Sequence, residues 1–265
     1  MIKKTKNSND YILTKTDDIW VRDFTKQTVK PFDINNLIPL EDQKLMLENE
    51  IKNQEKIYQG LDTEDFSHDK IVIIGDGDQF EENIQRIPEG VTVIGVNRAF
   101  ARWPKNKRLN YYVVNNPYPE CIYNYPEIIT NWPKCISSTR TYPQFLYNYR
   151  GLVYLYSPVN NGYYSGVKSE HSLLIDDYRS SICAAINLSY KFKVKKLLLL
   201  SLLETYDNRP GCENGLYPQQ KMVHSLIDAN LYWMKRINIG HCNDKLIYEN
   251  AAYIKDIKGF FDGRT

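Results

Sequence analysis

Residues 70–80 read KIVIIGDGDQF, a short apolar run followed at once by a glycine turn. The run 71–74 is continuous and β-branched, which is typical of a parallel strand covered on both faces. Gly75 and Gly77 come next, and the residues from Gln79 onward have a helical pattern. A strand, a glycine turn and a helix N-terminus can present free backbone N–H groups to an anion. The stretch therefore favours nucleotide binding over an ordinary turn between a strand and a helix.

From residue 67 onward the chain alternates apolar strand patterns with helical patterns. Further strands are predicted at 91–97, 110–116, 133–139, 152–157, 195–202 and 245–250. Helices are predicted at 81–87, 143–149, 176–193 and 217–237. This alternation predicts an α/β fold, a Rossmann-like three-layer sandwich with a mostly parallel sheet.

The remaining segments give the predicted domain organisation. Residues 1–66 form an N-terminal extension with a strand and turn and then a helix that starts at Leu40 and stops at Gly60. We expect this extension to pack on the main domain or to make a homo-oligomer or assembly contact. Residues 67–265 form the nucleotide-binding domain, and its long loop 158–177 has the length of a lid.

Composition excludes several classes of function. The 265 residues include 34 Lys and Arg against 32 Asp and Glu, a net charge of +2. No basic field therefore points to nucleic acid or to an anionic membrane. No segment approaches 18 uninterrupted apolar residues, so no membrane span is expected. The first residues lack the apolar core of a signal peptide, and the five scattered cysteines include no CxxC pair. These features predict a cytoplasmic protein with reduced thiols, without a zinc site or a disulfide framework.

The glycine turn departs from the dinucleotide fingerprint. Phe80 occupies the place of the third glycine, and the second strand ends in Asn97 where an acid would hold a ribose. NAD is therefore disfavoured, and no GxxxxGK[ST] phosphate loop occurs either.

Polar residues recur where the predicted strands end. They are Asp76 after the first strand, Asn97 after the second, and Asn115 and Asn116 after the third. The carboxyl ends of parallel strands share one crevice, where ligands usually bind. We expect these side chains to hydrogen-bond a base, a ribose or a phosphate. Each asparagine has the alternative role of a turn former.

Arg179, Ser180 and Ser181 open the helix at 176–193. A guanidinium, two hydroxyls and exposed N–H groups at a helix N-terminus suit a phosphate. The alternative is a plain N-cap with an acidic first turn, because Asp176 and Asp177 precede them.

Two further groups are candidates for chemistry. His224 lies within the helix at 217–237 with Asp228 one turn later, a pair that can orient a general base; a structural histidine is the alternative. Asp76 and Asp78 are weak candidates for Mg²⁺ ligands beside a phosphate, since acids in turns are usually just solvated.

Residues 70–235 resemble a Rossmann-like superfamily that includes the DUF115 or MptE-like proteins and the bacterial sialyltransferases of glycosyltransferase family 42. IIGDGDQF is similar to their strand and G-N-G turn, with Asp76 in place of the asparagine. VIGVNRAF and VVNNPYPE are similar to their C-N-Q and Y-N-P strand ends, and RSSICAAINLSYKF to their alanine-rich helix. His224-Ser225 is similar to the H-S context of their catalytic base. The chain departs from the family at LSLLETYD, where the family has G-x-D.

The resemblance implies a nucleotide-sugar-dependent glycosyltransferase of the sialyltransferase-like type, with a donor such as a CMP-sugar, a glycan acceptor and His224 as the base. The acid at position 76 fits better with the MptE-like branch, whose members resemble pyrophosphokinases that use ATP and Mg²⁺ on a pterin. The unmatched N-terminal segment favours a third interpretation, a non-catalytic Rossmann-like structural or assembly protein of viral origin with a vestigial site.

Overall fold

The computed structural model of the chain describes residues 3–4, 11–12, 40–55, 58–60, 67–77, 79–126, 131–158, 173–175, 177, 180–191, 194–202, 237–242 and 251–263. The strand pattern near residue 20, nearly all of the helix at 217–237 and the strand at 245–250 lie outside these residues, as do Asp78, Arg179 and His224. A two-residue antiparallel pair, β1 (Lys3–Lys4) with β2 (Tyr11–Ile12), stands apart from the main sheet.

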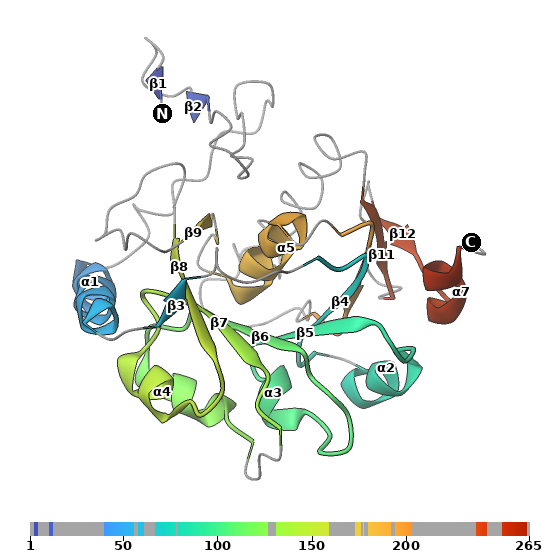
Figure 1. Ribbon diagram of the computed structural model, residues 1–265, viewed down its shortest axis with the longest axis horizontal. Helices are drawn as coiled ribbons and strands as arrows, with labels where there is room; N and C mark the ends of the chain where they lie inside the picture. The colour runs from blue at the N-terminus through green and yellow to red at the C-terminus, as the bar shows by residue number, and fades with distance from the viewer. Residues whose placement is uncertain are drawn as a thin grey trace.

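Ten strands of the described chain form one sheet, and every pairing within it is parallel (Figure 1). In order from one edge, they are β12 (Ala252–Tyr253), β11 (Asn238–His241), β10 (Lys196–Leu200), β4 (Lys70–Ile74), β5 (Thr92–Val96), β6 (Tyr111–Val114), β7 (Lys134–Ser138), β8 (Val153–Pro158) and β3 (Gln59–Gly60). β9 (Leu173–Ile175) pairs with the last part of β8. The predicted α/β fold with a parallel sheet is confirmed.

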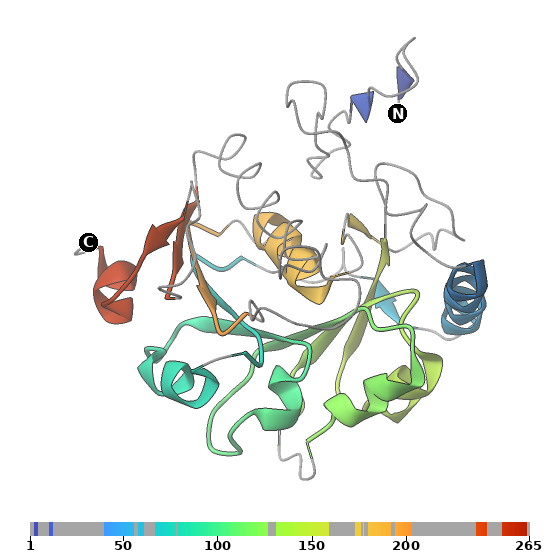
Figure 2. The same cartoon turned by 180° about the vertical axis from the view of Figure 1, so that it is seen from behind.

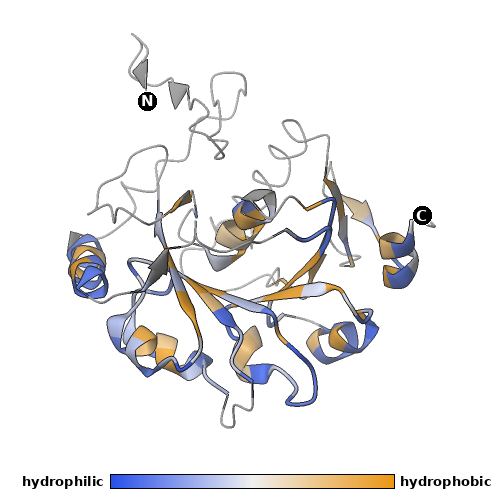
Figure 3. Ribbon diagram, viewed as in Figure 1, coloured by the Kyte–Doolittle hydropathy of each residue, from blue (hydrophilic) through white to orange (hydrophobic). Residues whose placement is uncertain are grey.

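The central strands are buried on both faces because helices cover both. The helix α5 (Ser181–Lys191) lies on one face. The other face carries α2 (Phe80–Arg86), α3 (Ala99–Arg102), η4 (Pro119–Asn124) and α4 (Pro143–Asn148), as Figures 1 and 2 show. The helix α7 (Ile257–Asp262) lies beside β12. Figure 3 shows apolar residues concentrated in the strands of the sheet.

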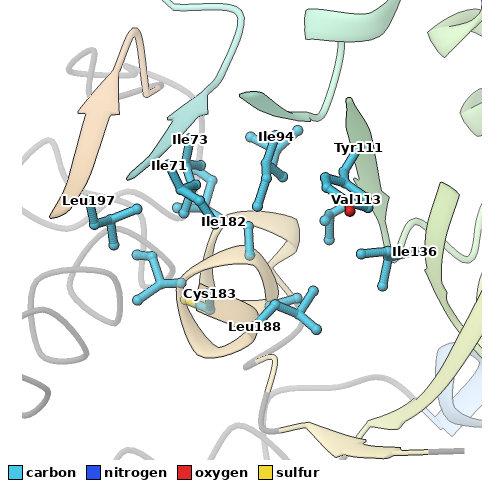
Figure 4. Close-up of a cluster of buried hydrophobic side chains, with 14 of the residues drawn as sticks. Ile71, Ile73, Ile94, Tyr111, Val113, Ile136, Ile182, Cys183, Leu188 and Leu197 are labelled. Atoms are coloured by element: carbon cyan, nitrogen blue, oxygen red, sulfur yellow. The ribbon is translucent and has the colours of Figure 1, made fainter. Parts of the chain in front are cut away.

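Alternate residues of each strand enter two separate cores. In β4, Ile71 and Ile73 pack toward α5, whereas Val72 and Ile74 pack toward α2. Figure 4 shows part of the first core, in which strand side chains such as Ile73, Ile94 and Val113 surround Cys183 and Leu188 of α5. Alternation of side chains along a strand, combined with apolar residues at every position, places β4 in the middle of a three-layer structure.

The helix α1 (Leu40–Gln54) differs from its sequence pattern in two ways. It ends at Gln54, and Gln59–Gly60 forms β3, which pairs with β8. The edge of β8 has backbone hydrogen-bonding groups that need strand partners, and a helix continued to Gly60 could not supply them. Its apolar Leu47 and Ile51 are 43% and 46% exposed, while a polar face is buried. The predicted stop at Gly60 is therefore wrong.

The strand order reverses between β4 and β10. The chain builds the sheet outward from β4 to β8, returns through α5, and adds β10, β11 and β12 on the other side of β4. The chain continues from β4 to β5 on one side and from β10 to β11 on the other. In open α/β sheets, the carboxyl ends of the strands at such a reversal are the usual ligand position.

We predict that Gly77→Ala lowers the free energy of unfolding by about 1–3 kcal/mol, the usual cost of overpacking. A Cβ at Gly77 would lie 2.8 Å from the carbonyl oxygen of Ser201 and 2.9 Å from that of Leu202, and backbone atoms cannot swing aside. Urea unfolding measures the change. Gly95→Ala is the control, since its Cβ would meet only side chains, the nearest that of Leu109 at 3.2 Å. Equal stabilities for the two variants would contradict the close approach at Gly77.

Candidate functional site

The glycine turn after β4 closes directly onto the end of β10. The Gly75 N–H donates to the Leu200 carbonyl at 3.1 Å, and the Gly77 N–H donates to the Ser201 carbonyl at 2.8 Å. A Cβ at Gly75 would lie 2.6 Å from the Ser201 carbonyl oxygen, so close packing requires a glycine there. These two N–H groups are thus bound within the protein, which differs from the expectation that they are free for an anion.

Asp76 places a carboxylate at the carboxyl end of β4, where the strand order reverses. Its side chain is partly buried, and its Oδ1 atom is buried without a hydrogen-bond partner in the described chain. Burial raises the pKa of Asp76 above its usual value, while backbone N–H groups and the nearby Arg98 and Arg102 lower it in part. Arg102 also donates to the Asp76 carbonyl at 2.6 Å, which holds the turn in place. One oxygen of the carboxylate thus has no hydrogen-bond partner among the described residues.

Asn97 ends β5 in the left-handed conformation, with φ 53°. Asparagine adopts this conformation more readily than most residues. The Tyr112 hydroxyl donates to its carbonyl at 3.0 Å, which fixes the turn from β5 into α3. The backbone role accounts for an asparagine here, and the half-buried side chain lies at the same edge of the sheet as Asp76.

Asn115 and Ser181, both predicted to bind nucleotide, are brought together. The Ser181 hydroxyl donates to Asn115 Oδ1 at 2.9 Å, and Asn115 Nδ2 donates to Asp177 Oδ2 at 3.4 Å. The Tyr156 hydroxyl also donates to Asp177 Oδ2, at 3.0 Å. Burial and the Asp177 carboxylate raise the pKa of Tyr156 well above its usual value, so the hydroxyl keeps its proton. The network joins β6, β8 and the start of α5.

Ser180 and Asn116 have local structural roles. The Cys183 N–H donates to the Ser180 hydroxyl at 3.4 Å, the geometry of an N-cap for α5. The Tyr118 N–H donates to Asn116 Oδ1 at 2.9 Å, which makes Asn116 a turn former. Ser180 is thus an N-cap and Asn116 a turn former, the alternatives that the sequence left open beside ligand binding.

A pocket of about 150 Å³ opens beside Asn115, between α1 and the ends of β6, β7 and β8. We call it the α1 pocket. It is lined by Met46, Asn115, Pro117, Tyr118, Ser138, Arg140, Pro158 and Asp177. Arg140 lies in the polar run Ser-Ser-Thr-Arg-Thr that ends the strand predicted at 133–139. Arg140 is not among the predicted site residues, although it follows a strand end as Asp76, Asn97 and Asn115 do.

Three buried polar side chains of α1 hold the segment that carries Arg140. Asn53 Nδ2 donates to the carbonyls of Thr139 and Thr141 at 2.9 and 2.7 Å. Asn49 Nδ2 donates to the Arg140 carbonyl at 3.2 Å. Glu50 accepts from the Thr139 hydroxyl at 3.1 Å and lies 3.6 Å from Arg140 Nε. Helix α1 thus contributes Met46 to the wall of the pocket and fixes the segment that contributes Arg140.

Other predicted groups are not placed. Arg179, Asp78, His224 and most of the loop 158–177 lie outside the described residues. In the part of the chain that the structure describes, no group of three His, Cys, Asp or Glu side chains is arranged to hold a metal ion. None of the described helices is long and apolar enough to cross a membrane.

The fold is similar to that of the MAf glycosyltransferase from Magnetospirillum magneticum AMB-1. The TM-score is 0.62 at 15% sequence identity, over 84% of this chain and 39% of that protein. The chain therefore spans well under half of the length of this structural relative. Comparisons with known protein families and with curated proteins gave no match.

We predict that Asp76→Asn stabilises the protein at neutral pH. Because the folded-state pKa of Asp76 is raised, the folded state binds more protons than the unfolded state between the two pKa values. The stability of the natural chain therefore falls as the pH rises through this window. Asparagine does not ionise, so Asp76→Asn should have the higher free energy of unfolding at pH 7. The difference should shrink as the pH falls through that window toward the ordinary pKa of an aspartate.

Urea unfolding of Asp76→Asn and of the natural chain, at pH 7 and at a pH near the ordinary pKa of an aspartate, measures this difference. Glu89→Gln, at an exposed acid, is the control and should show no such trend. An Asp76→Asn protein less stable than the natural chain at pH 7 would contradict the prediction.

Proposed function

We propose that this chain is a nucleotide-sugar-dependent glycosyltransferase that acts on a glycan acceptor. The observation that carries the proposal is the convergence of polar groups at one edge of the parallel sheet. Asp76 lies at the strand-order reversal, and Asn97 and Asn115 end the next two strands. The likeness in fold to a glycosyltransferase supports the same class of reaction.

In this proposal the nucleotide lies across the ends of β4, β5 and β6. The Asp76 carboxylate accepts a hydrogen bond from a donor group of the nucleotide, a hydroxyl or an amine, because a phosphate would be repelled by it. Asn97 supplies an amide on the next strand. Asn115 has both ends of its amide engaged by Ser181 and Asp177, which would orient it rigidly beside the nucleotide.

The diphosphate or phosphate of the donor would lie toward the start of α5. Ser180 and Ser181 are at its N-terminus, where N–H groups and the helix dipole favour an anion, and Arg179 adds a guanidinium. Since the N–H groups of Gly75 and Gly77 bind the end of β10, they are not the proposed phosphate ligands.

His224 is the proposed general base. It would remove the proton from the acceptor hydroxyl as that oxygen attacks the anomeric carbon of the donor sugar, and the nucleotide would leave. The loop 158–177 would close over the donor and exclude water, which otherwise would hydrolyse it.

The unpartnered oxygen of Asp76 favours a second candidate, an MptE-like pyrophosphokinase. There Asp76 and Asp78 would bind Mg²⁺ and position ATP for transfer of its diphosphate.

A nucleotide panel separates the two candidates. Calorimetry with CMP, UDP and ATP, each with and without Mg²⁺, should show binding of CMP or UDP and not require the metal. Asp76→Ala should weaken that binding by about tenfold, the loss of one hydrogen bond to a charged group. ATP binding that depends on Mg²⁺ would instead support the pyrophosphokinase, and no binding of any nucleotide would refute both.

With the donor known, His224→Ala should lower the transfer rate by about 10²–10⁴-fold and leave nucleotide affinity nearly unchanged. His68→Gln is the matched control, because His68 contacts Tyr111 and Thr92 at the opposite edge of the sheet. Full activity in His224→Ala would show that another group is the base.

A further inference from the structure

The α1 pocket lies next to the proposed nucleotide site but is separate from it. Asn115 borders both, while Arg140, Ser138 and Pro158 come from the ends of β7 and β8, farther from the reversal between β4 and β10. Nothing in the proposed handling of the nucleotide uses Arg140 or the polar face of α1.

The size of the pocket limits its occupant. A cavity of about 150 Å³ holds roughly one six-membered ring. Sites for larger ligands such as whole nucleotides are typically of about 300–1,000 Å³. The occupant is therefore a single small ring or less.

The lining suits a hydroxylated ring. Arg140 supplies only donors, and the carboxyl oxygens of Asp177 supply acceptors, so a hydroxyl that both donates and accepts can be matched between them. Ser138 and Tyr118 add hydroxyls. Met46, Pro117 and Pro158 offer apolar surface for the C–H faces of a ring. Apolar walls with a few convergent polar groups are typical of small-ligand sites.

The charges favour a neutral ring. Glu50, whose side chain is 1% exposed, lies behind Arg140 and offsets its charge. Asp177, 2% exposed, adds a second carboxylate to the wall. Among the described residues the pocket thus sets two carboxylates against one guanidinium, which repels rather than attracts a carboxylate or phosphate ligand.

The buried polar face of α1 also supports a binding site at this pocket. Asn49, Glu50 and Asn53 are at most 2% exposed, whereas Leu47 and Ile51 face solvent. Burying polar groups does not by itself favour stability, because their loss of hydration must be offset by the new hydrogen bonds. What the arrangement does achieve is a fixed position for Thr139, Arg140 and Thr141, and a binding site needs such fixed groups.

We propose that the α1 pocket binds one neutral pyranose ring of the sugar substrates, with Arg140 and Asp177 as its hydrogen-bonding partners. Glu50 is a positioning residue that holds Arg140. The inference rests on the proposed function for the statement that the sugar is a substrate. The ring belongs either to the donor or to the end of the acceptor glycan, and the chemistry of recognition is the same for both.

Saturation-transfer NMR on the full chain tests the pocket with methyl glucoside, methyl galactoside and methyl N-acetylglucosaminide. At least one should bind, and glucuronate and inorganic phosphate should bind more weakly. Arg140→Lys and Asp177→Asn should each weaken the neutral sugar by about tenfold or more, because each removes a hydrogen bond to a charged group. Arg140→Lys should keep the nucleotide affinity of the natural chain, because Arg140 makes none of the proposed nucleotide contacts. Asp177→Asn is not used for that comparison, since Asp177 accepts from Asn115.

Glu50→Gln tests the positioning role, with Glu48→Gln on the exposed side of α1 as the control. The amide keeps an oxygen for the Thr139 hydroxyl but loses the charge that faces Arg140. Because Glu50→Gln takes the carboxylate away from a buried guanidinium, the melting temperature should also fall, and affinities are compared where both variants are folded. There, sugar affinity should fall while nucleotide affinity stays close to that of the control. Equal changes in both affinities, or none, would overturn the role given to Glu50.

The two proposals fail separately. Sugar binding that is lost in Asp177→Asn supports the pocket even if no nucleotide binds. Sugar-transfer activity with unchanged KM values in Arg140→Lys and Asp177→Asn would overturn the pocket and leave the glycosyltransferase intact. Preferential binding of glucuronate or phosphate would also overturn it. A weaker affinity of Arg140→Lys for the nucleotide sugar, but not for the bare nucleotide, assigns the ring to the donor. A raised KM of Arg140→Lys for the acceptor alone assigns it to the acceptor.

Discussion

The pairing of β4 with β10 is the constraint on which the site depends. The two strands lie far apart in the chain but form five parallel residue pairs, from Lys70 with Lys196 to Ile74 with Leu200. The glycine turn extends this contact, because the N–H groups of Gly75 and Gly77 continue the hydrogen bonding onto Leu200 and Ser201. This pairing sets the reversal of the strand order and so places Asp76 at the usual ligand position of an open α/β sheet.

The glycines of the turn illustrate how one residue pattern serves two different physical needs. A glycine after a strand permits a phosphate to approach backbone N–H groups, and it equally permits a second backbone to approach. In this chain the second need applies, since a side chain at either position would meet backbone atoms after β10. The N–H groups of the turn are therefore engaged within the protein, and the proposed nucleotide site uses the carboxylate of Asp76 instead.

The N-terminal helix α1 connects the periphery of the sheet to the site. Its buried asparagines and glutamate satisfy carbonyl and hydroxyl groups in the segment after β7, and Met46 reaches both the pocket and the core around α5. The domain division at residue 66 stays a prediction. The contacts of α1 nevertheless make this helix part of the wall of a pocket, a role that its sequence does not indicate.

The sequence by itself determined the fold class and most strand positions, because continuous apolar runs such as 71–74 can only be buried between two layers of helices. It also located polar residues at the strand ends. Only the tertiary structure decided which of these have local partners: Asn116 shapes a turn, while Asn115 joins Ser181 and Asp177. The inverted helix α1 and the Arg140 pocket could not be read from periodicity. The environment of Glu50 and Asn53 is made of groups about 90 residues away, and only folding brings them together.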